Sequence, residues 1–239
     1  LTSKRSASLD PRQGLENVLT GRGIALRWNS LSAWQQAAVG SQSVLDWLRG
    51  RSDDASLRQR VRRDDAGAIK SAVLGDIVDS EPRYVGPPAA LLTDGFNPGY
   101  SAFRDAQAER RAVVYVGAND GMLHAIDATV DGSSAGTDGG KELFAYVPSF
   151  LFDGPTLPRQ PTLDGLAALS SKTWVHRYYV NATPAVGDVD FARTATTITN
   201  KSLAADWRTV LVGGLGKGGR GFYALDVTDP AALTEANAA

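Results

Sequence analysis

The sequence predicts an all-β protein that is built from repeated antiparallel units and is preceded by a short helical segment. The first observation is a hairpin pattern that occurs twice: Val113–Gly117 followed by Leu123–Thr129, and Thr209–Gly213 followed by Phe222–Thr228. The second is a change in the sequence pattern after Ile69, where short apolar runs alternate with turn residues. A self-similar pair of strands joined by a Gly-rich turn is typical of a repeat architecture.

The composition places the chain among folded globular proteins. Of its 239 residues, 43% are hydrophobic and 21% are charged, and the net charge is −1. This balance is unlike that of a disordered chain. It also gives no long-range attraction to nucleic acid or to an anionic membrane surface, so we expect no nucleic-acid partner.

The chain contains no cysteine, which excludes a zinc–thiolate site, a disulfide framework and a thiol nucleophile. No apolar run reaches the roughly 18 residues of a membrane-spanning helix, so we expect no membrane span. The sequence starts at Leu1 without a basic and then apolar leader. We therefore expect it to be a piece of a longer protein.

Residues 1–68 are predicted to form a helical and irregular lead-in segment. A helix is expected over Ser30–Arg49, because apolar residues recur there at three- and four-residue spacings and Gly50 follows as a stop. The three tryptophans of this region are interpreted as packing against the next domain: Trp28, Trp34 and Trp47. Residues 49–65 mix arginines with aspartates, a pattern that is typical of a solvated face.

Residues 69–239 are predicted to form the blades. Each predicted strand spans a few residues and is rich in β-branched and aromatic side chains. The expected strands are Ala72–Val78, Arg83–Gly86, Ala112–Gly117, Met122–Ala128, Leu143–Val147, Val175–Val180, Ala185–Val189, Thr209–Gly213 and Phe222–Val227. Asn119-Asp120-Gly121 predicts a tight hairpin, because Asn and Gly tolerate positive φ. Longer loop insertions are expected near residues 131–140 and 152–171.

Each copy of the hairpin belongs to a larger unit. A Pro-marked strand comes first, a more apolar strand ending in Val-Gly follows, and a turn leads to a third strand; Glu142–Val147 supplies a fourth in the first unit. Four antiparallel strands in a meander make one blade of a β-propeller. The two copies lie much farther apart than the ~40–45 residues of a WD-type blade, which indicates long insertions. A β-sandwich also has many short strands, but it does not require the same hairpin twice.

Two units leave open sheet edges, which pair readily with other strands. We therefore expect an incomplete ring, to be completed by later residues of a longer parent chain or by another subunit.

The most conspicuous motif is Gly214–Gly219, which matches the dinucleotide-binding pattern of glycines. That fingerprint needs a helix after the loop, whereas Phe222–Val227 is predicted to be a strand. A phosphate loop needs Ser or Thr after its lysine, whereas Gly218 follows Lys217. The motif is therefore interpreted as the hairpin loop of the second unit.

Acidic residues at strand ends are interpreted as caps of turn amides. Asp188-Val189-Asp190 resembles the start of a calcium loop, but Phe191-Ala192-Arg193 breaks that pattern. The same structural interpretation applies to Asp76, Asp79, Asp127 and Asp226.

The two histidines, His124 and His176, lie far apart in the sequence. His124 aligns with Tyr223 of the second copy, which predicts a half-buried strand position and not a ligand or a base. No serine has the context of a nucleophile, and Asn181-Ala182-Thr183 and Asn200-Lys201-Ser202 match the glycosylation pattern only as short motifs. We assign no catalytic, cofactor-binding or metal-binding residue.

Several stretches together carry a family resemblance. Leu74-Gly75-Asp76-Ile77-Val78-Asp79-Ser80-Glu81-Pro82 precedes a Tyr-Val-Gly strand, and the first hairpin reads Val-Tyr-Val-Gly-Ala-Asn-Asp-Gly-Met-Leu-His-Ala over residues 114–125. Residues 184–190 (Pro-Ala-Val-Gly-Asp-Val-Asp) and the Val-Gly-Gly…Tyr-Ala-Leu-Asp hairpin follow, and residues 45–50 (Leu-Asp-Trp-Leu-Arg-Gly) lie upstream. In this order they resemble the C-terminal propeller of the PilY1/PilC family, the tip-associated proteins of type IV pili, over roughly residues 45–230.

The resemblance implies a non-catalytic propeller, with quinoprotein-dehydrogenase-like blades, in a secreted bacterial protein. Family members are exported through the periplasm to the pilus tip or outer membrane. They support pilus assembly with the minor pilins, adhesion to host or abiotic surfaces, and twitching motility. The family's calcium loop is an Asp/Asn-rich run in a later blade with no matching positions here, so no cofactor is expected in this chain. Contacts are expected on the loops Asp131–Gly140 and Phe152–Ser171, because loops vary on a framework of strands.

Two alternatives stay open. The first is a secreted binding propeller that is unrelated to pili. The second is a fragment of a quinoprotein dehydrogenase, an enzyme class that holds a quinone with calcium and an Asp base at the centre of the ring, often beside a vicinal disulfide. The chain has no cysteine and no recognisable repeat of cofactor-stacking tryptophans, which argues against the enzyme.

Overall fold

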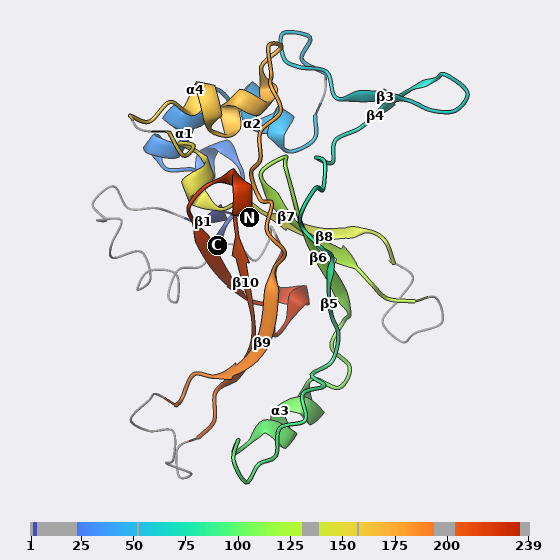
Figure 1. Cartoon of the computed structure of the whole chain (residues 1–239), viewed down its shortest axis with the longest axis vertical. Helices are drawn as coiled ribbons and strands as arrows, with labels where there is room; N and C mark the ends of the chain where they lie inside the picture. The colour runs from blue at the N-terminus through green and yellow to red at the C-terminus, as the bar shows by residue number, and fades with distance from the viewer. Residues whose placement is uncertain are drawn as a thin grey trace.

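The computed structural model describes residues 2–3, 23–51, 53–130, 139–156, 158–193 and 204–234. Two antiparallel sheets lie side by side in the middle of the molecule, and most of the helices gather at one end of them (Figure 1). Helix α3 (Tyr100–Ala106) lies at the opposite end. The predicted loop Asp131–Gly140 falls largely outside the described residues.

The first sheet is the four-stranded meander that the sequence predicts, with the strand order β5-β6-β7-β8. Its strands are β5 (Arg83–Val85), β6 (Val113–Ala118), β7 (Met122–Asp127) and β8 (Glu142–Tyr146). Ala118 pairs with Met122 across the turn, and Gly121 has a φ of 91°. This confirms the Asn-Asp-Gly hairpin, because only glycine adopts that conformation without strain.

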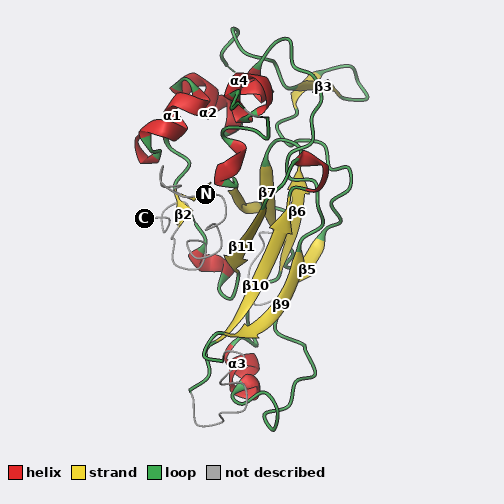
Figure 2. Ribbon diagram, turned by 60° about the vertical axis from the view of Figure 1, so that its left-hand side comes forward, coloured by secondary structure: helices red, strands yellow, loops and turns green. Residues whose placement is uncertain are grey.

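The second sheet has the order β11-β10-β9 and is also antiparallel. Its strands are β9 (Ala185–Asp190), β10 (Trp207–Gly214) and β11 (Phe222–Asp226). Figure 2 shows this sheet beside the first, and β5 contacts β9 where the two meet. The doubled hairpin therefore forms the centre of two neighbouring blade-like sheets.

The two hairpins differ in register by one residue. Gly117 pairs with Leu123 in the first sheet, whereas Gly213 pairs with Tyr223 in the second. A slip of one residue moves side chains to the opposite face of a strand. Accordingly Asp127 has a fully buried side chain, whereas the side chain of Asp226 is 47% exposed.

The lead-in segment contains two short helices in place of the single predicted helix. Helix α1 (Ala33–Val39) ends at Gly40, whose φ of 87° stops it, and α2 (Gln42–Leu48) restarts after Ser41. Ser32 caps α1 through a capping box with Gln35, which satisfies backbone N–H groups at the start of the helix. Trp47 is fully buried, and Trp28 and Trp34 pack against the core, in agreement with the predicted packing role.

The segment 152–171 is not a free loop. It contains α4 (Pro161–Asp164) and the 3₁₀ helix η3 (Leu166–Ser170), which pack on α1 and α2. Leu166 and Leu169 are buried there, as is Phe152, whose ring lies 6.1 Å from that of Trp34. The sequence reasoning missed this because the helices are too short to produce a recognisable periodicity.

Two predicted strands are absent and one hairpin is new. Within the described part of the chain, residues 72–78 and 175–180 are extended connecting segments without ladder partners. The missed elements are helix α3 and an exposed hairpin of β3 (Val61–Arg63) and β4 (Ile69–Ser71). The Arg-rich segment that leads into this hairpin is not uniformly solvated, because Arg60 is buried.

The remaining elements are short. They are β1 (Thr2–Ser3) paired with β2 (Gly23–Ile24), and the 3₁₀ helices η1 (Trp28–Ser30), η2 (Ser149–Leu151), η4 (Gly216–Gly218) and η5 (Pro230–Ala232). Among the residues that the structure describes, no helix is long and apolar enough to cross a membrane. One hydrophobic cluster runs from the helices through both sheets, so the helical layer and the blades share a core.

Candidate functional site

The polar residues singled out in the sequence meet where the two sheets and the helical layer come together. We call this region the blade junction; it comprises residues 74–83, the turn Asn119–Gly121 and residues 176–184. The stretch 74–82 carries much of the family resemblance, and it is an extended segment that runs between the other two parts. Its hydrogen bonds reach both, so it joins the first blade to the chain that enters the second.

Asn119 is the centre of the junction. Its backbone N–H donates to the carbonyl of Asp76 at 3.0 Å, and its side-chain amide donates to the Asp76 carboxylate at 2.9 Å. Its side-chain oxygen accepts from the backbone N–H of Tyr179 at 3.0 Å. His176 Nε2 lies 2.8 Å from the same Asp76 carboxylate. One buried amide therefore ties three segments that are distant in the sequence.

A second set of bonds continues along the same segment. Asn181 donates to the Asp79 carboxylate at 2.6 Å, and Lys217 lies 3.0 Å from it. These hydrogen bonds hold the pKa of Asp79 below its usual value. Glu81 N–H donates to the Thr183 hydroxyl at 2.9 Å. Asp76 and Asp79 thus bridge segments through side chains and do not act only as caps of turn amides.

His124 is buried and lies between two carboxylates. Its Nε2 is 3.1 Å from Asp120, and its Nδ1 is 2.5 Å from Glu142. Burial alone would lower the pKa of His124, but hydrogen bonds and charges from Asp120 and Glu142 outweigh it and raise the pKa to about 9. The prediction of a half-buried position was wrong, and the register difference places His124 and Tyr223 on opposite faces of their sheets.

The pKa of His124 predicts an alkaline loss of stability. A folded-state pKa of about 9 exceeds the ordinary 6.5, so the stabilisation is complete below pH 6.5 and is lost as the pH rises through 9. Because the side chain of Glu142 is half exposed to water, we expect a loss of about 1–2 kcal/mol in the free energy of unfolding. Urea titrations at pH 6 and pH 9.5 measure it. His124→Gln should flatten this dependence, whereas the control His176→Gln should retain it.

Loss of the Asn119 side-chain amide should weaken the hydrogen bonds that hold the blade junction together. In Asn119→Ala the buried N–H of Tyr179 has no acceptor and Asp76 loses a donor, so we expect a destabilisation of about 2–3 kcal/mol. The midpoint of chemical unfolding measures this change. Asn97→Ala is the matched control, because the Asn97 amide makes an exposed bond to Thr93. Equal, small effects of both variants would contradict the central role of Asn119.

The glycine motif Gly214–Gly219 lies in the turn between β10 and β11, as the sequence predicts. It forms the 3₁₀ helix η4, and a strand follows it, so it has no helix N-terminus for a phosphate. A Cβ atom on Gly218 would lie 1.9 Å from the carbonyl oxygen of Tyr179, so glycine is required by close packing against the junction. The motif therefore has a structural explanation.

Among the aspartates predicted to cap turn amides, Asp127, Asp190 and Asp226 do so, whereas Asp188 does not. Asp127 accepts from the backbone N–H of Thr129, and Asp226 accepts from that of Thr228. Asp190 likewise accepts from two backbone N–H groups. Asp188 differs, because it accepts from the hydroxyls of Tyr100 and Thr209. In the described residues, no group of three or more His, Asp or Glu side chains is placed to hold a metal ion.

A four-stranded and a three-stranded antiparallel sheet, set side by side and joined by an interlocking segment, are typical of the blades of a β-propeller. A model of the PilY1 β-propeller domain family matches residues 74–237, which is more than half of the chain. The chain therefore belongs to the PilY1 β-propeller domain family. This confirms the resemblance carried by the sequence motifs and the predicted fold class.

Individual relatives agree with this assignment. The type IV pilus biogenesis factor PilY1 homolog of Xylella fastidiosa is 40% identical over 202 residues, which cover 82% of this chain and 14% of the relative. The type IV pilus biogenesis factor PilY1 of Pseudomonas aeruginosa PAO1 is 37% identical over 232 residues, which cover 91% of this chain and 17% of the relative. The chain thus spans less than a fifth of each of these proteins.

A solved structure was also matched. The crystal structure of the Pseudomonas aeruginosa PilY1 C-terminal domain is 36% identical and matches 62% of this chain and 23% of that chain, with a TM-score of 0.38.

Proposed function

We propose that this chain is the propeller part of a type IV pilus biogenesis factor and acts through protein–protein contacts, without catalysis. The observation that carries the proposal is the family match over residues 74–237, together with relatives that are named type IV pilus biogenesis factors. The parent protein would act at the cell surface, at the pilus tip or the outer membrane. Its partners would be minor pilins, and its activity would support adhesion and twitching motility.

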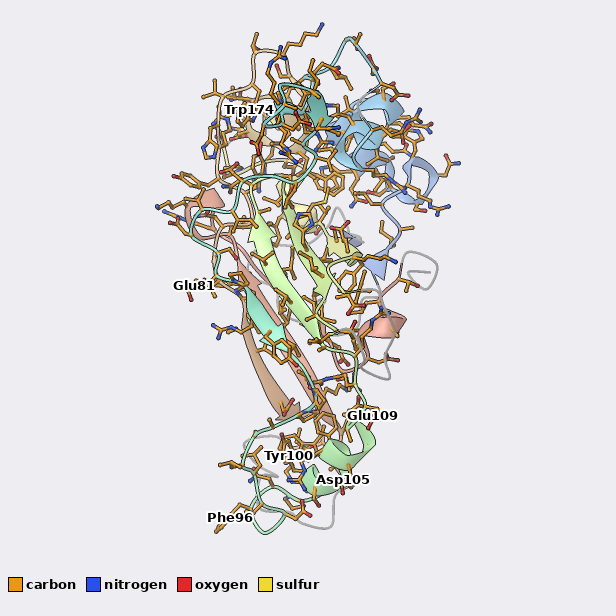
Figure 3. The ribbon with its side chains drawn as sticks, turned by 90° about the vertical axis from the view of Figure 1, so that its right-hand side faces the viewer. Glu81, Phe96, Tyr100, Asp105, Glu109 and Trp174 are labelled. Carbon is orange, nitrogen blue, oxygen red and sulfur yellow. The ribbon has the colours of Figure 1, made fainter. Side chains whose placement is uncertain are left out.

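We place the protein contacts on the long connection between β5 and β6, residues 86–112, which we call the β5–β6 excursion. In the segment 152–171, Phe152 and residues 164–170 are largely packed into the core, and its exposed part offers one large apolar side chain, Leu163, which is 47% exposed. The excursion instead holds two large apolar side chains in solvent, with Leu91 99% and Phe96 89% exposed. Figure 3 shows Phe96 at the extremity of the molecule, far from Trp174. Apolar side chains that are exposed to this degree favour a contact surface.

The base of the β5–β6 excursion is fixed to the second blade by aromatic residues. Tyr100 at the start of α3 is fully buried, and its hydroxyl donates to Asp188 of the second blade at 2.7 Å. Its ring stands edge-on to Trp207 at 5.0 Å, and the Trp207 indole N–H donates to the carbonyl of Pro98. A fixed base of this kind presents Phe96 with little entropic cost on binding.

Genetic complementation tests the proposal. Deletion of the gene for the full-length parent protein is expected to reduce surface piliation, twitching and adhesion, and unchanged phenotypes would refute the pilus role. Complementation with Phe96→Ser in the full-length protein should restore protein levels but weaken the capture of minor pilins. Phe222→Ser is the matched control, because Phe222 is 80% exposed on β11 of the second blade. Normal capture by the Phe96 variant would move the contact surface elsewhere.

The enzyme alternative has its own test. The full-length protein is incubated with pyrroloquinoline quinone, calcium and an alcohol or sugar, and dye reduction is followed. We expect no turnover above that of the cofactor alone. Reproducible turnover would overturn the non-catalytic assignment.

A further inference from the structure

A pocket of about 230 Å³ opens between the helical layer and the blade junction. Its walls combine Trp47 of α2, Arg58 and Arg60 before β3, the turn residues Asn119 and Asp120, and Trp174. Trp174 is labelled in Figure 3 at the end of the molecule where the helices lie. The sequence reasoning did not single out this place, because its parts come from separate segments of the chain, between residues 47 and 174.

Aromatic and cationic side chains alternate along one wall. The guanidinium of Arg60 lies 3.9 Å from the centre of the Trp47 ring. The guanidinium of Arg58 lies 5.2 Å from the Trp47 ring and 4.1 Å from the Trp174 ring. Stacking between two indoles fixes a guanidinium without using its N–H groups. Arg58 is therefore held in place with hydrogen-bonding capacity left over.

The wall has more donors than acceptors. Arg58 donates through Nε to the carbonyl of Leu169, and Arg60 donates to the carbonyls of Trp47 and Val73. Neither guanidinium forms an ion pair with a carboxylate among the described residues. Arg60 Nε and Trp174 Nε1 are buried without an acceptor. Arg58, a cation without a carboxylate partner in the described part of the chain, and the unsatisfied donors at the same wall favour an anionic ligand.

The two carboxylates that line the pocket keep their charges but do not face both arginines equally. Burial lowers the pKa of Arg60 and the charge of Asp120 partly opposes this, whereas no carboxylate of the described residues acts on Arg58 in this way. Asp120 accepts from the backbone N–H groups of Gly75 and Met122 and lies beside His124. Asp76 accepts from Asn119 and lies beside His176. Arg58, whose printed hydrogen bond uses only Nε, therefore keeps its terminal nitrogens for an incoming acceptor.

The rim indicates what kind of anion fits. Val73 and Leu74 line the pocket and are 42% and 52% exposed, and Ile77 and Val78, farther along the same segment, are exposed to a similar degree. A phosphate polyanion gains nothing from such a rim, and the whole chain carries a net charge of −1. A peptide can place a carboxylate on the guanidinium and apolar neighbours on the rim at the same time.

We propose that this pocket binds the carboxylate of an acidic side chain in a peptide segment of a partner protein. The terminal nitrogens of Arg58 would donate to the carboxylate, and Val73 and Leu74 would contact the apolar residues that flank it. The proposal rests on the geometry of the pocket and stands independently of the role in pili.

Calorimetric titration of the whole chain with two peptides tests the proposal. The probes are the acetylated and amidated tripeptides Leu-Glu-Leu and Leu-Gln-Leu, which differ by one charge. We expect the glutamate peptide to bind at least about tenfold more tightly, as a charge-assisted hydrogen bond requires. Arg58→Gln should abolish this preference. Arg62→Gln, which removes a neighbouring exposed charge outside the pocket, should leave it unchanged.

Two further arms keep the outcome decisive. Arg58→Lys retains the positive charge but lacks the planar guanidinium, and we expect it to prefer the glutamate peptide by a few fold. If Arg58→Gln does not fold, the comparison of the two peptides on the wild-type chain still tests the proposal. Equal binding of both peptides, or an unchanged preference in a folded Arg58→Gln variant, would overturn the proposal. Displacement of the glutamate peptide by inorganic phosphate at micromolar concentration would also overturn it, since it would define a small-anion site.

Discussion

Replacing Trp47 by alanine is expected to lower the free energy of unfolding of this chain by about 3–5 kcal/mol, in the range of large-to-small aromatic substitutions in protein cores. The Trp47 side chain is only 2% exposed and belongs to the core shared by the helices and the blades. Its indole N–H donates to the carbonyl of Arg58 at 2.6 Å. The variant would also remove the ring on which Arg60 and Arg58 stack.

Urea unfolding followed by far-UV circular dichroism measures this effect. Trp47→Phe keeps most of the apolar volume and loses the N–H donor, so we expect a smaller cost of about 1–2 kcal/mol. Phe222→Ala removes an aromatic side chain that is 80% exposed, and it should change stability by less than about 0.5 kcal/mol. A cost of Trp47→Ala no larger than that of Phe222→Ala would show that the helical layer contributes little to the fold.

The centre of each blade could be predicted from the sequence because its information is local. Strands β6 and β10 are rich in β-branched and aromatic residues, β7 is a short and mainly apolar run, and Asn119-Asp120-Gly121 specifies a hairpin by its conformational preferences. Gly121 indeed adopts positive φ. Period-two patterns and turn chemistry act over a few residues, so a single sequence is sufficient to find them.

The relative register of the two hairpins could not be predicted in this way. The Ala-φ-Asp pattern aligns His124 with Tyr223, yet the ladders place Leu123 and Tyr223 in equivalent positions opposite Gly117 and Gly213. Register is set by the geometry of the turn and by packing across the sheet. The second turn is longer and contains η4, so sequence similarity on either side of it does not fix the pairing.

Long-range hydrogen bonding explains why two predicted strands are absent and why the burial of Arg60 was not predicted. Residues 72–78 and 175–180 have strand-like composition, but in the structure they connect elements. Asp76 and Tyr179, one from each segment, bond to Asn119 in the turn of the first blade and not to a neighbouring strand. The buried Arg60 looks solvated in the sequence because its partners are the carbonyls of Trp47 and Val73, which no local pattern reveals. The sequence therefore singled out individual residues of the family motif, such as Asp76 and Asp79, but not the junction that they form.

Residues of the family motif make close contacts that explain why glycine and serine occur in it. In the stretch 74–82, Gly75 has no room for a side chain, since a Cβ atom would lie 2.3 Å from the backbone nitrogen of Asp120. Ser80 accepts from the backbone N–H of Gly117, the glycine that ends the apolar strand of the first copy. Gly117 in turn approaches the carbonyl of Val180 too closely for any Cβ. The motif and the repeated glycine thus serve one contact between neighbouring blades.

The contact between the blades has an aromatic half, and its loss is the second large effect that we expect. Tyr223 on β11 is 3% exposed, and its ring lies 5.3 Å from that of Tyr146 on β8 of the first blade. The ring also lies over Gly213, where a Cβ atom would meet it at 2.1 Å. Tyr223→Ala should therefore lower the free energy of unfolding by about 3–5 kcal/mol, measured by the midpoint of urea unfolding.

Tyr223→Phe separates the contribution of the ring from that of the hydroxyl. The hydroxyl of Tyr223 is buried without a hydrogen-bond partner, and this burial raises the pKa of Tyr223. Because an unpaired buried polar group is costly, its removal should leave stability unchanged or increase it by up to about 1 kcal/mol. If Tyr223→Phe instead cost as much as Tyr223→Ala, the hydroxyl would have to bind a group at the blade interface. The expected pair of results, a large loss for alanine and none for phenylalanine, would assign the adhesion between the blades to aromatic packing.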